Sequence, residues 1–166
     1  PYTTLFRSVV REDPERKGLL YAGTETAVYL SFDGGAKWQL FSGNLPVVPV
    51  TDLEVRHGDL IASTEGRSFW ILDDLSVLRQ RADSIATAAV HLYAPRAAVL
   101  AGGSSGPTRN AGRNPPYGAT VFFRLATAPD TASTVLLEFL DARGTVVRSF
   151  ATRGDSVNKL TVKEGL

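Results

Sequence analysis

Ser31, Asp33, Gly35 and Trp38 stand at the spacing S-x-D-x-G-x-x-W, directly after an apolar run of the sequence. An aspartate in such a place could serve as an acid or as a metal ligand. The spacing also suits a tight turn, because a short Asp side chain accepts hydrogen bonds from nearby backbone N–H groups and glycine adopts positive φ freely. Trp38 then supplies a large apolar surface for packing. Turn chemistry accounts for the whole pattern, so we interpret these four residues as structural.

A second group of residues that could bind a ligand is the turn that carries Glu65 and Arg67. A carboxylate beside a guanidinium can hold a sugar or a peptide terminus through charge-assisted hydrogen bonds. The alternative is that both residues form a solvated pair in a turn and that Trp70 belongs to the core. We therefore name Glu65 and Arg67 as candidate ligand-binding residues and leave this alternative open.

Catalytic chemistry finds little support in the remaining residue types. Glycoside hydrolysis needs two carboxylates, about 5–5.5 Å apart for retention or about 6.5–9.5 Å apart for inversion. The plausible carboxylates here are Asp52, Glu65, Asp73 and Asp74. His57 lies in a polar turn and His91 begins an apolar run, and neither has a second histidine at metal-ligand spacing. We expect no catalytic residue, no metal site and no cofactor in this chain.

The composition narrows the class of protein without naming a ligand. The 166 residues include 18 Lys and Arg against 17 Asp and Glu, and no block of charge stands out. This balance argues against nucleic acid or an acidic membrane surface as a partner. No apolar run approaches the roughly 18 residues that a membrane span needs. The sequence contains no Cys, which excludes disulfides and thiolate metal sites.

Two segments of the sequence repeat each other at a separation of forty residues. "LYAGTETAVYLSFDG" begins at Leu20 and "LIASTEGRSFWILDD" begins at Leu60, and an alignment without gaps pairs Asp33 with Asp73. Each copy reads as a short strand, a turn with Thr-Glu, a second strand and an acidic turn. The predicted strands lie near residues 8–11, 19–24, 27–32 and 37–41, and near 50–56, 59–64 and 67–72. A period of about 40 residues with several short strands is typical of a β-propeller blade.

The composition changes after Leu100. Residues 101–118 are rich in Gly, Ser, Pro and Asn and predict a linker. Beyond them, Asp141 to Gly144 separate two β-rich runs and predict a hairpin. Val135, Leu137 and Phe139 alternate with other residues and should form the core side of that hairpin. The segment "NKLTVKEGL" predicts the start of another strand.

Residues 9–100 resemble the closing blades of the sortilin-like Asp-box propellers, the BNR-repeat group that also includes sialidases and xyloglucanase-type glycoside hydrolases. The resemblance rests on "LLYAGTETAVYLSFDGGAKW", "IASTEGRSFWILDDLSVLRQ" and "HLYAPR". It implies that Ser31, Asp33, Gly35 and Trp38 are the residues of a structural Asp-box, which lies at the rim of a propeller, away from the central face where ligands bind. It also implies that residues 119–166 begin an immunoglobulin-like β-sandwich.

These observations predict an all-β protein made of about two blades of a partial propeller, a linker, and a truncated immunoglobulin-like sandwich. Residues 1–8, "PYTTLFRS", resemble a translated sequencing adapter, so we expect the natural sequence to start near Val9. Two blades cannot close a propeller, because each blade packs against a neighbour on both sides. We therefore expect the chain to be a fragment.

The resemblance favours part of a secreted or periplasmic bacterial protein that binds a protein, peptide or glycan without catalysis. The alternative is a glycoside hydrolase of the Asp-box type with most of its active site outside this chain. Sugar-cleaving propellers line a cleft with Trp and Tyr, whereas this sequence has two Trp, both at strand or turn positions. The residue pattern therefore favours a binding scaffold.

Overall fold

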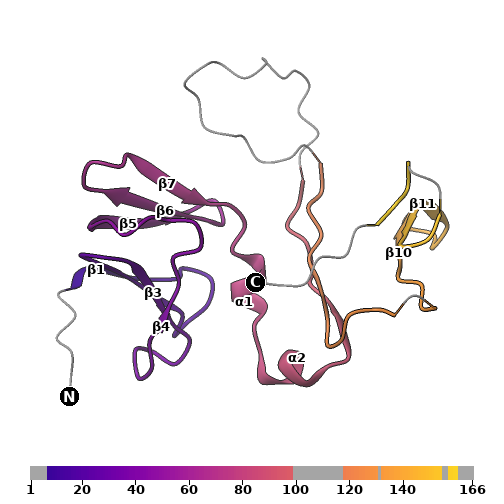
Figure 1. Ribbon diagram of the computed structural model, residues 1–166, viewed down its shortest axis with the longest axis horizontal. Coiled ribbons are helices and arrows are strands. Elements are labelled where there is room, and N and C mark those ends of the chain that lie inside the picture. Colours follow the sequence, from indigo (N-terminus) through magenta and orange to yellow (C-terminus); the bar gives the residue numbers. More distant parts are fainter. Residues whose placement is uncertain (1–6, 99–117, 131, 155–156, 161–166) are drawn as a thin grey trace, which may run out of the picture. The chain divides into compact units, whose positions relative to one another are not determined.

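The computed structural model describes residues 7–98, 118–130, 132–154 and 157–160 (Figure 1). The chain divides into two compact units: residues 1–81 with 93–122, and residues 82–92 with 123–166. Apart from Gly118, the predicted linker over 101–118 lies outside the described residues. Of the eight adapter-like residues, 1–6 lie outside them as well, and Arg7 and Ser8 begin the first strand. The predicted domain ranges stay predictions.

The first unit contains two antiparallel sheets. In the first sheet the strands are β1 (Arg7–Glu12), β2 (Leu20–Thr24), β3 (Val28–Ser31) and β4 (Gln39–Leu40), in the order β1-β2-β3-β4. In the second sheet they are β5 (Val50–Arg56), β6 (Asp59–Thr64) and β7 (Phe69–Leu72), in the order β5-β6-β7. These strands match the seven that the repeat predicts, and the all-β class with small antiparallel sheets is confirmed.

The two sheets of this unit pack face to face, as Figure 1 shows, with β5 in contact with both β1 and β2. The buried residues of this interface include Tyr21, Leu30, Val50 and Leu53, none of them more than 1% exposed. Gly23 lies against side chains of both sheets, Val9 of the first and Val50 of the second. A Cβ atom at Gly23 would stand 2.7 Å from Val50 Cγ1 and 2.8 Å from Val9 Cγ1, so no larger residue fits without movement.

The sequence repeat is also a structural repeat, with a one-residue shift that the ungapped alignment misses. Gly23 pairs with Val28 across the first turn, whereas Ser63 pairs with Phe69 across the second, which is one residue longer. The N–H of Gly34 donates to Gly18 O at 2.9 Å, and the N–H of Leu75 donates to Gly58 O at 2.7 Å. The separation is therefore forty residues before the turn and forty-one after it.

The one-residue shift changes which aspartate of the second copy is equivalent to Asp33 of the first. Asp74, and not Asp73, occupies the position of Asp33, directly before the residue whose N–H reaches back to the hairpin glycine. Asp74 accepts a hydrogen bond from the N–H of Ser76, while Asp73 is exposed. The ungapped alignment chose the wrong aspartate because the two acids are adjacent in sequence.

In each copy of the repeat, hydrogen bonds from a threonine close the turn between the two strands. The hydroxyl of Thr24 donates to Ala27 O at 2.9 Å, and the hydroxyl of Thr64 donates to Ser68 O at 2.6 Å. In each case the N–H of the same threonine donates to the same carbonyl. The recurring Thr is therefore a turn residue, which explains why it appears in both copies.

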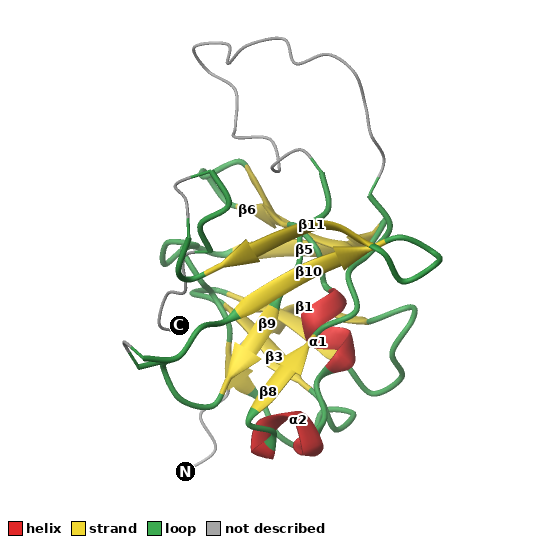
Figure 2. Ribbon diagram, turned by 90° about the vertical axis from the view of Figure 1, so that its right-hand side faces the viewer, coloured by secondary structure: helices red, strands yellow, loops and turns green. Residues whose placement is uncertain are grey.

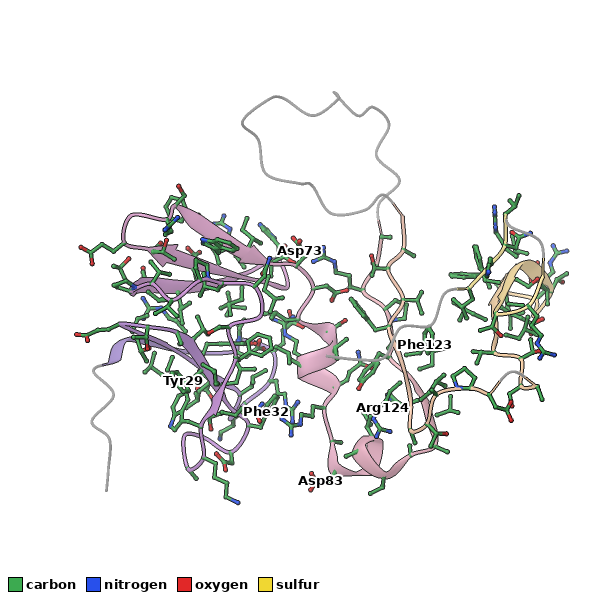
Figure 3. All side chains as sticks on the ribbon, in the orientation of Figure 1. Tyr29, Phe32, Asp73, Asp83, Phe123 and Arg124 are labelled. Carbon is green, nitrogen blue, oxygen red and sulfur yellow. The ribbon has the colours of Figure 1, made fainter. Side chains whose placement is uncertain are left out.

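The second unit holds two further pairs of strands (Figure 2). Strand β8 (Val90–Leu92) pairs with β9 (Phe123–Leu125), and β10 (Leu136–Leu140) pairs with β11 (Val146–Ala151), both antiparallel. The guanidinium of Arg124 donates to Ala88 O at 2.8 Å and fixes the segment before β8 to β9 (Figure 3).

The predicted hairpin of the second unit is confirmed. Asp141 Oδ1 accepts the N–H groups of Arg143 and Thr145, and Gly144 has φ +82° in the turn between β10 and β11. Phe139, on the predicted core side, meets Phe150 edge to face at 5.9 Å between ring centroids. The strand predicted over "NKLTVKEGL" is described only as a single parallel bridge from Lys159 to Ala151.

Two short helices, which the sequence did not predict, follow the second sheet: α1 (Ser76–Gln80) and α2 (Asp83–Thr87). The end of α1 is held by Arg16, whose guanidinium donates to the carbonyls of Leu78, Arg79 and Arg81. A cation that satisfies the last carbonyls of a helix stabilises it. Because Arg16 is more than sixty residues away in sequence, local patterns cannot reveal this helix.

We predict that Gly23→Ala lowers the free energy of unfolding of the first unit by about 1–3 kcal/mol, because the added methyl overlaps two valine side chains. Urea unfolding followed by tryptophan fluorescence measures this unit, since Trp38 and Trp70 both belong to it. The double variant Gly23→Ala/Val50→Ala should lose less than the sum of the two single changes. Strict additivity would contradict the close approach of the sheets at Gly23.

Candidate functional site

The Asp-box residues form one closed turn after β3. Ser31 Oγ donates to Asp33 Oδ1 at 2.8 Å and accepts the N–H of Gly35 at 2.9 Å. Asp33 Oδ1 also accepts the N–H of Lys37 at 2.8 Å. The hydrogen bonds from the Lys37 N–H and the Ser31 hydroxyl lower the pKa of Asp33. The carboxylate is therefore held as an anion that serves the turn.

Gly35 and Trp38 complete this turn by packing. Gly35 has φ +95°, and a Cβ atom there would lie 3.4 Å from Leu20 Cδ1 and 3.6 Å from Trp38 Cζ2. The indole thus lies beside Leu20 and over the glycine, on the side of the first sheet that faces away from the second. The structure brings together the four residues of the S-x-D-x-G-x-x-W pattern, and it gives each of them a structural contact.

Glu65 and Arg67 lie in the exposed turn between β6 and β7. Their backbones are tied down: the Glu65 N–H donates to Pro49 O at 2.9 Å, and Arg67 O accepts the indole N–H of Trp70 at 3.0 Å. In the described part of the chain, no ion pair joins the two side chains. They are two separate charged groups on an anchored turn, which differs from the solvated pair considered above. Trp70 is partly buried against the core cluster.

The carboxylates considered for hydrolysis are not gathered into one site by any described contact. Asp52 pairs with Arg11 at 2.6 Å, Asp74 accepts the Ser76 N–H, and Asp73 and Glu65 are exposed. His57 forms the two-residue hairpin turn between β5 and β6 together with Gly58, and His91 lies in β8. Within the described ranges, no group of three or more His, Asp or Glu side chains could hold a metal ion.

Among the residues that the structure describes, the most buried charged group is Asp13, which the sequence analysis did not single out. Its side chain is fully buried and accepts the N–H groups of Glu15 and Arg16, each at 2.9 Å. It also accepts the Tyr21 hydroxyl at 2.8 Å and Arg79 Nε at 3.0 Å. We call these five residues the Asp13–Arg79 network. It joins the loop after β1, the start of β2 and the helix α1.

The electrostatics of this network follow from its burial. Burial by itself raises the pKa of Asp13, but hydrogen bonds from the Glu15 N–H, the Tyr21 hydroxyl and the Arg79 guanidinium outweigh it and leave the pKa lowered. Burial and the hydrogen bond to Asp13 raise the pKa of Tyr21. Asp13 therefore stays ionised and Tyr21 stays neutral over the whole physiological range.

Arginine side chains extend the network over an aromatic ring. The guanidinium carbons of Arg16 and Arg81 lie 5.2 Å and 4.3 Å from the centre of the Phe32 ring (Figure 3). Cations at such distances are attracted by the ring face. Arg79 also pairs with Glu15 at 2.7 Å. A sequence signal for this cluster exists only in the turn residues "DPER", since Arg79 lies far along the chain.

A polar cavity of the first unit borders this network, between the β5–β6 turn, α1 and residues 94–96. Three buried atoms in residues that line it have no hydrogen-bond partner in the described protein: Asp74 Oδ2, Ser76 Oγ and Arg79 Nη2. One acceptor, one hydroxyl and one cationic donor suit ordered water or the hydroxyl groups of a small polar molecule. These groups could bind such a molecule but offer no activated nucleophile.

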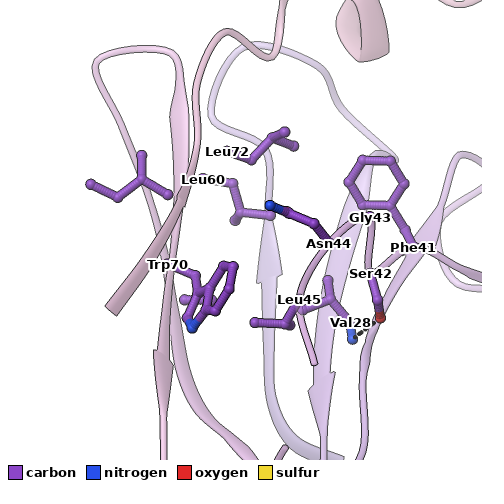
Figure 4. A pocket seen from close by; sticks show the side chains of 11 residues that line it. Val28, Phe41, Ser42, Gly43, Asn44, Leu45, Leu60, Trp70 and Leu72 are labelled. Atoms are coloured by element: carbon purple, nitrogen blue, oxygen red, sulfur yellow. Dashed lines mark hydrogen bonds between the residues drawn. The ribbon is translucent and has the colours of Figure 1, made fainter. Parts of the chain in front are cut away.

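An apolar cavity opens between the two sheets near β7 (Figure 4). Val28, Leu45, Leu60 and Trp70 are among its lining residues, and the N–H of Val28 donates to Ser42 Oγ at 3.3 Å on its wall. No charged residue lines it. The arrangement suits an apolar side chain rather than a reacting group.

Comparison of the chain with protein-family models, with curated proteins and with solved structures finds no match. Within the described residues, no helix has the length and apolar character needed to cross a membrane.

We predict that Asp13→Asn lowers the free energy of unfolding by about 3–5 kcal/mol at neutral pH, because it removes the buried anion of the pair and leaves Arg79 with only the exposed carboxylate of Glu15. The pKa of Asp13 is lowered in the folded state, so its contribution is complete above its ordinary value of 3.8 and disappears as the pH falls below it. The difference between wild type and variant should therefore shrink on acidification. Urea unfolding at several pH values measures it.

The matched control is Asp73→Asn, which changes an exposed aspartate in the same way and should alter the free energy by less than about 0.5 kcal/mol. A difference between wild type and Asp13→Asn that stays constant from neutral to acidic pH would contradict the network.

We further predict that Ser31→Ala destabilises the first unit by about 1–2 kcal/mol, since the buried hydroxyl both donates to Asp33 and accepts from Gly35. Thr26→Ala, which removes a hydroxyl from an exposed residue of the preceding turn, should have little effect. Thermal unfolding followed by tryptophan fluorescence compares the two. Equal stability of both variants would show that the Asp-box turn does not support the sheet.

Proposed function

We propose that this chain is part of a secreted or periplasmic bacterial protein of the sortilin-like Asp-box propeller group. In this proposal the two sheets of the first unit are propeller blades, and residues 119–166 belong to an immunoglobulin-like sandwich. The chain acts as a non-catalytic scaffold that contributes to the binding of a protein, peptide or glycan. Its ligand-binding residues are Glu65 and Arg67.

The observation that carries the proposal is the repeated hydrogen bond from each acidic turn to the preceding hairpin. Gly34 N–H reaches Gly18 O, and Leu75 N–H reaches Gly58 O, at equivalent places in the two copies. The residues that recur in this sequence thus serve the architecture of each sheet. This supports a protein built from a series of similar sheets. The turns that differ between the two copies are then the parts that can bind a ligand.

The state of the carboxylates supports binding rather than hydrolysis. A glycosidase needs a carboxylic acid whose pKa is raised, so that it can protonate the leaving group. Where a carboxylate of the described chain has a shifted pKa, the shift is downward, as at Asp13, Asp33 and Asp130. Each of these carboxylates accepts backbone N–H groups. None of the three is suited to act as a general acid.

The position of Glu65 and Arg67 supports their role in binding. They lie on a turn whose backbone is anchored to Pro49 and to Trp70, so the loss of conformational freedom on binding is small. Their side chains are exposed and lack an ion pair with each other among the described residues. A ligand that carries both a hydrogen-bond donor and an acceptor, such as a glycan or a peptide end, can therefore engage both.

The experiment tests turnover and binding on the same sample. We expect no release of reducing sugar from xyloglucan, no release of sialic acid from sialyllactose, and binding to members of an array of glycans and peptides. The double variant Glu65→Gln/Arg67→Gln should weaken that binding by about tenfold or more, because it removes charge-assisted hydrogen bonds.

Glu25→Gln is the matched control, since Glu25 follows Thr24 just as Glu65 follows Thr64 and is also exposed. It should bind like the wild type. Sugar release that disappears in Glu65→Gln would favour the hydrolase alternative instead. The absence of binding, or binding that the double variant leaves unchanged, would contradict the proposed site.

A further inference from the structure

The polar cavity of the first unit has a volume of about 360 Å³, a size typical of small-molecule binding sites. Its walls come from the β5–β6 turn, from the segment that runs from Asp74 into α1, and from residues 94–96. The turn follows β5 and Asp74 follows β7, so the cavity lies beyond the ends of these strands. A sheet that packs on a face of either sheet therefore does not fill it.

Contacts within the first unit hold these walls together. The side-chain amide of Gln80 on α1 donates to Ala94 O at 2.9 Å and accepts the N–H of Ala94 at 2.9 Å. The guanidinium of Arg96 donates to Asp59 Oδ1 at 2.7 Å, which joins residues 94–96 to the start of β6. The cavity is therefore held in shape by the first unit itself.

Three wall side chains each carry a buried polar atom that has no hydrogen-bond partner in the described protein: Asp74 Oδ2, Ser76 Oγ and Arg79 Nη2. Asp74 Oδ1 accepts the Ser76 N–H at 3.0 Å, which keeps this carboxylate beside Ser76. Ser76 and Arg79 lie three residues apart in α1, on one face of the helix. A buried polar group without a partner is unfavourable, so a bound molecule that pairs with these atoms stabilises the site.

The charges around the cavity favour a neutral ligand. Arg79 is already paired with two carboxylates, and Arg96 is paired with Asp59. The carboxylate of Asp74 forms no ion pair among the described residues, so it leaves an excess of negative charge that repels an anion. A cation would instead meet the Nη2 group of Arg79, which carries charge of the same sign.

We propose that this cavity binds a small neutral molecule with adjacent hydroxyl groups, a monosaccharide or a cyclic polyol. A hydroxyl group both donates and accepts, so one such group can donate to Asp74 Oδ2 while its neighbour accepts from Arg79 Nη2. The hydroxyl of Ser76 takes either role. The cavity lies at the opposite end of β6 from the turn that carries Glu65 and Arg67, and the proposal does not rest on the proposed function.

The test titrates the full chain, labelled with ¹⁵N, with myo-inositol, D-glucose and D-mannose, and follows the backbone and arginine side-chain N–H signals by NMR. The Nε–H of Arg79 donates to Asp13, so its signal is protected from exchange. At least one of the three compounds should shift the signals of Ser76 and Arg79 in a saturable way, with a dissociation constant of about 1 mM or lower. Tetrahydropyran, which has a ring without hydroxyl groups, and inorganic phosphate should shift neither signal.

Two single variants assign the binding to the cavity. Asp74→Asn removes an acceptor and should weaken binding by about tenfold. It should fold, because asparagine adopts the positive φ of this residue (63°) readily. Ser76→Ala should weaken binding by about threefold or more, yet it should leave the melting temperature without ligand unchanged, since the hydroxyl has no partner to lose. The matched controls Asp73→Asn and Ser84→Ala change exposed residues and should bind like the wild type.

Two results would overturn the inference. The first is the absence of a saturable shift with all three hydroxyl compounds, which leaves ordered water as the occupant of the cavity. The second is a shift that Asp74→Asn and Ser76→Ala leave unchanged; Ser76→Ala alone decides if Asp74→Asn loses the wild-type circular dichroism spectrum. The double variant Glu65→Gln/Arg67→Gln should bind the hydroxyl compound like the wild type, so a failure of this site and a failure of the proposed function are distinguishable.

Discussion

The buried carboxylate of Asp13 is the constraint on which the first unit depends. It lies in the loop between β1 and β2, accepts two backbone N–H groups there, and binds Tyr21 and Arg79 with its second oxygen. A buried ion pair costs desolvation energy unless further hydrogen bonds satisfy both partners. Here the carboxylate receives four different donors. Because Arg79 belongs to the helix that follows the second sheet, this one group ties the exit of the second sheet to the first.

The packing between the sheets depends on the same group through Tyr21. The tyrosine ring is fully buried in the core, and a phenol in an apolar interior needs a hydrogen-bond partner for its hydroxyl. Asp13 provides that partner at 2.8 Å. With Tyr21 fixed, β2 approaches β5 so closely that only glycine fits at position 23. The polar network and the apolar core are therefore parts of one arrangement.

The sequence predicted the strands well because their signals are local. Alternating apolar residues, the glycine-containing hairpins and the Thr turns each act within a few residues, and they repeat. The Asp-box turn could be predicted from the sequence for the same reason, since Ser31, Asp33 and Gly35 form hydrogen bonds only with one another and with nearby backbone. The helix α1 and the Asp13–Arg79 network could not be predicted from the sequence. Their partners lie more than sixty residues apart, and no local pattern distinguishes the largely buried Arg79 from an arginine at the surface.

The longer of the two threonine turns shows where this architecture accepts a change of length. The turn after Thr64 has one residue more than the turn after Thr24, yet the strands on both sides keep the same pairing, and the next acidic turn still reaches its hairpin glycine. The threonine closes the turn by bonding to the carbonyl of the residue directly before the next strand, Ala27 in one copy and Ser68 in the other. An inserted residue is thus absorbed before it can displace the sheet. Segments between Thr64 and Ser68 are therefore the natural place in this molecule for evolution, or for an engineer, to vary a loop on a fixed frame.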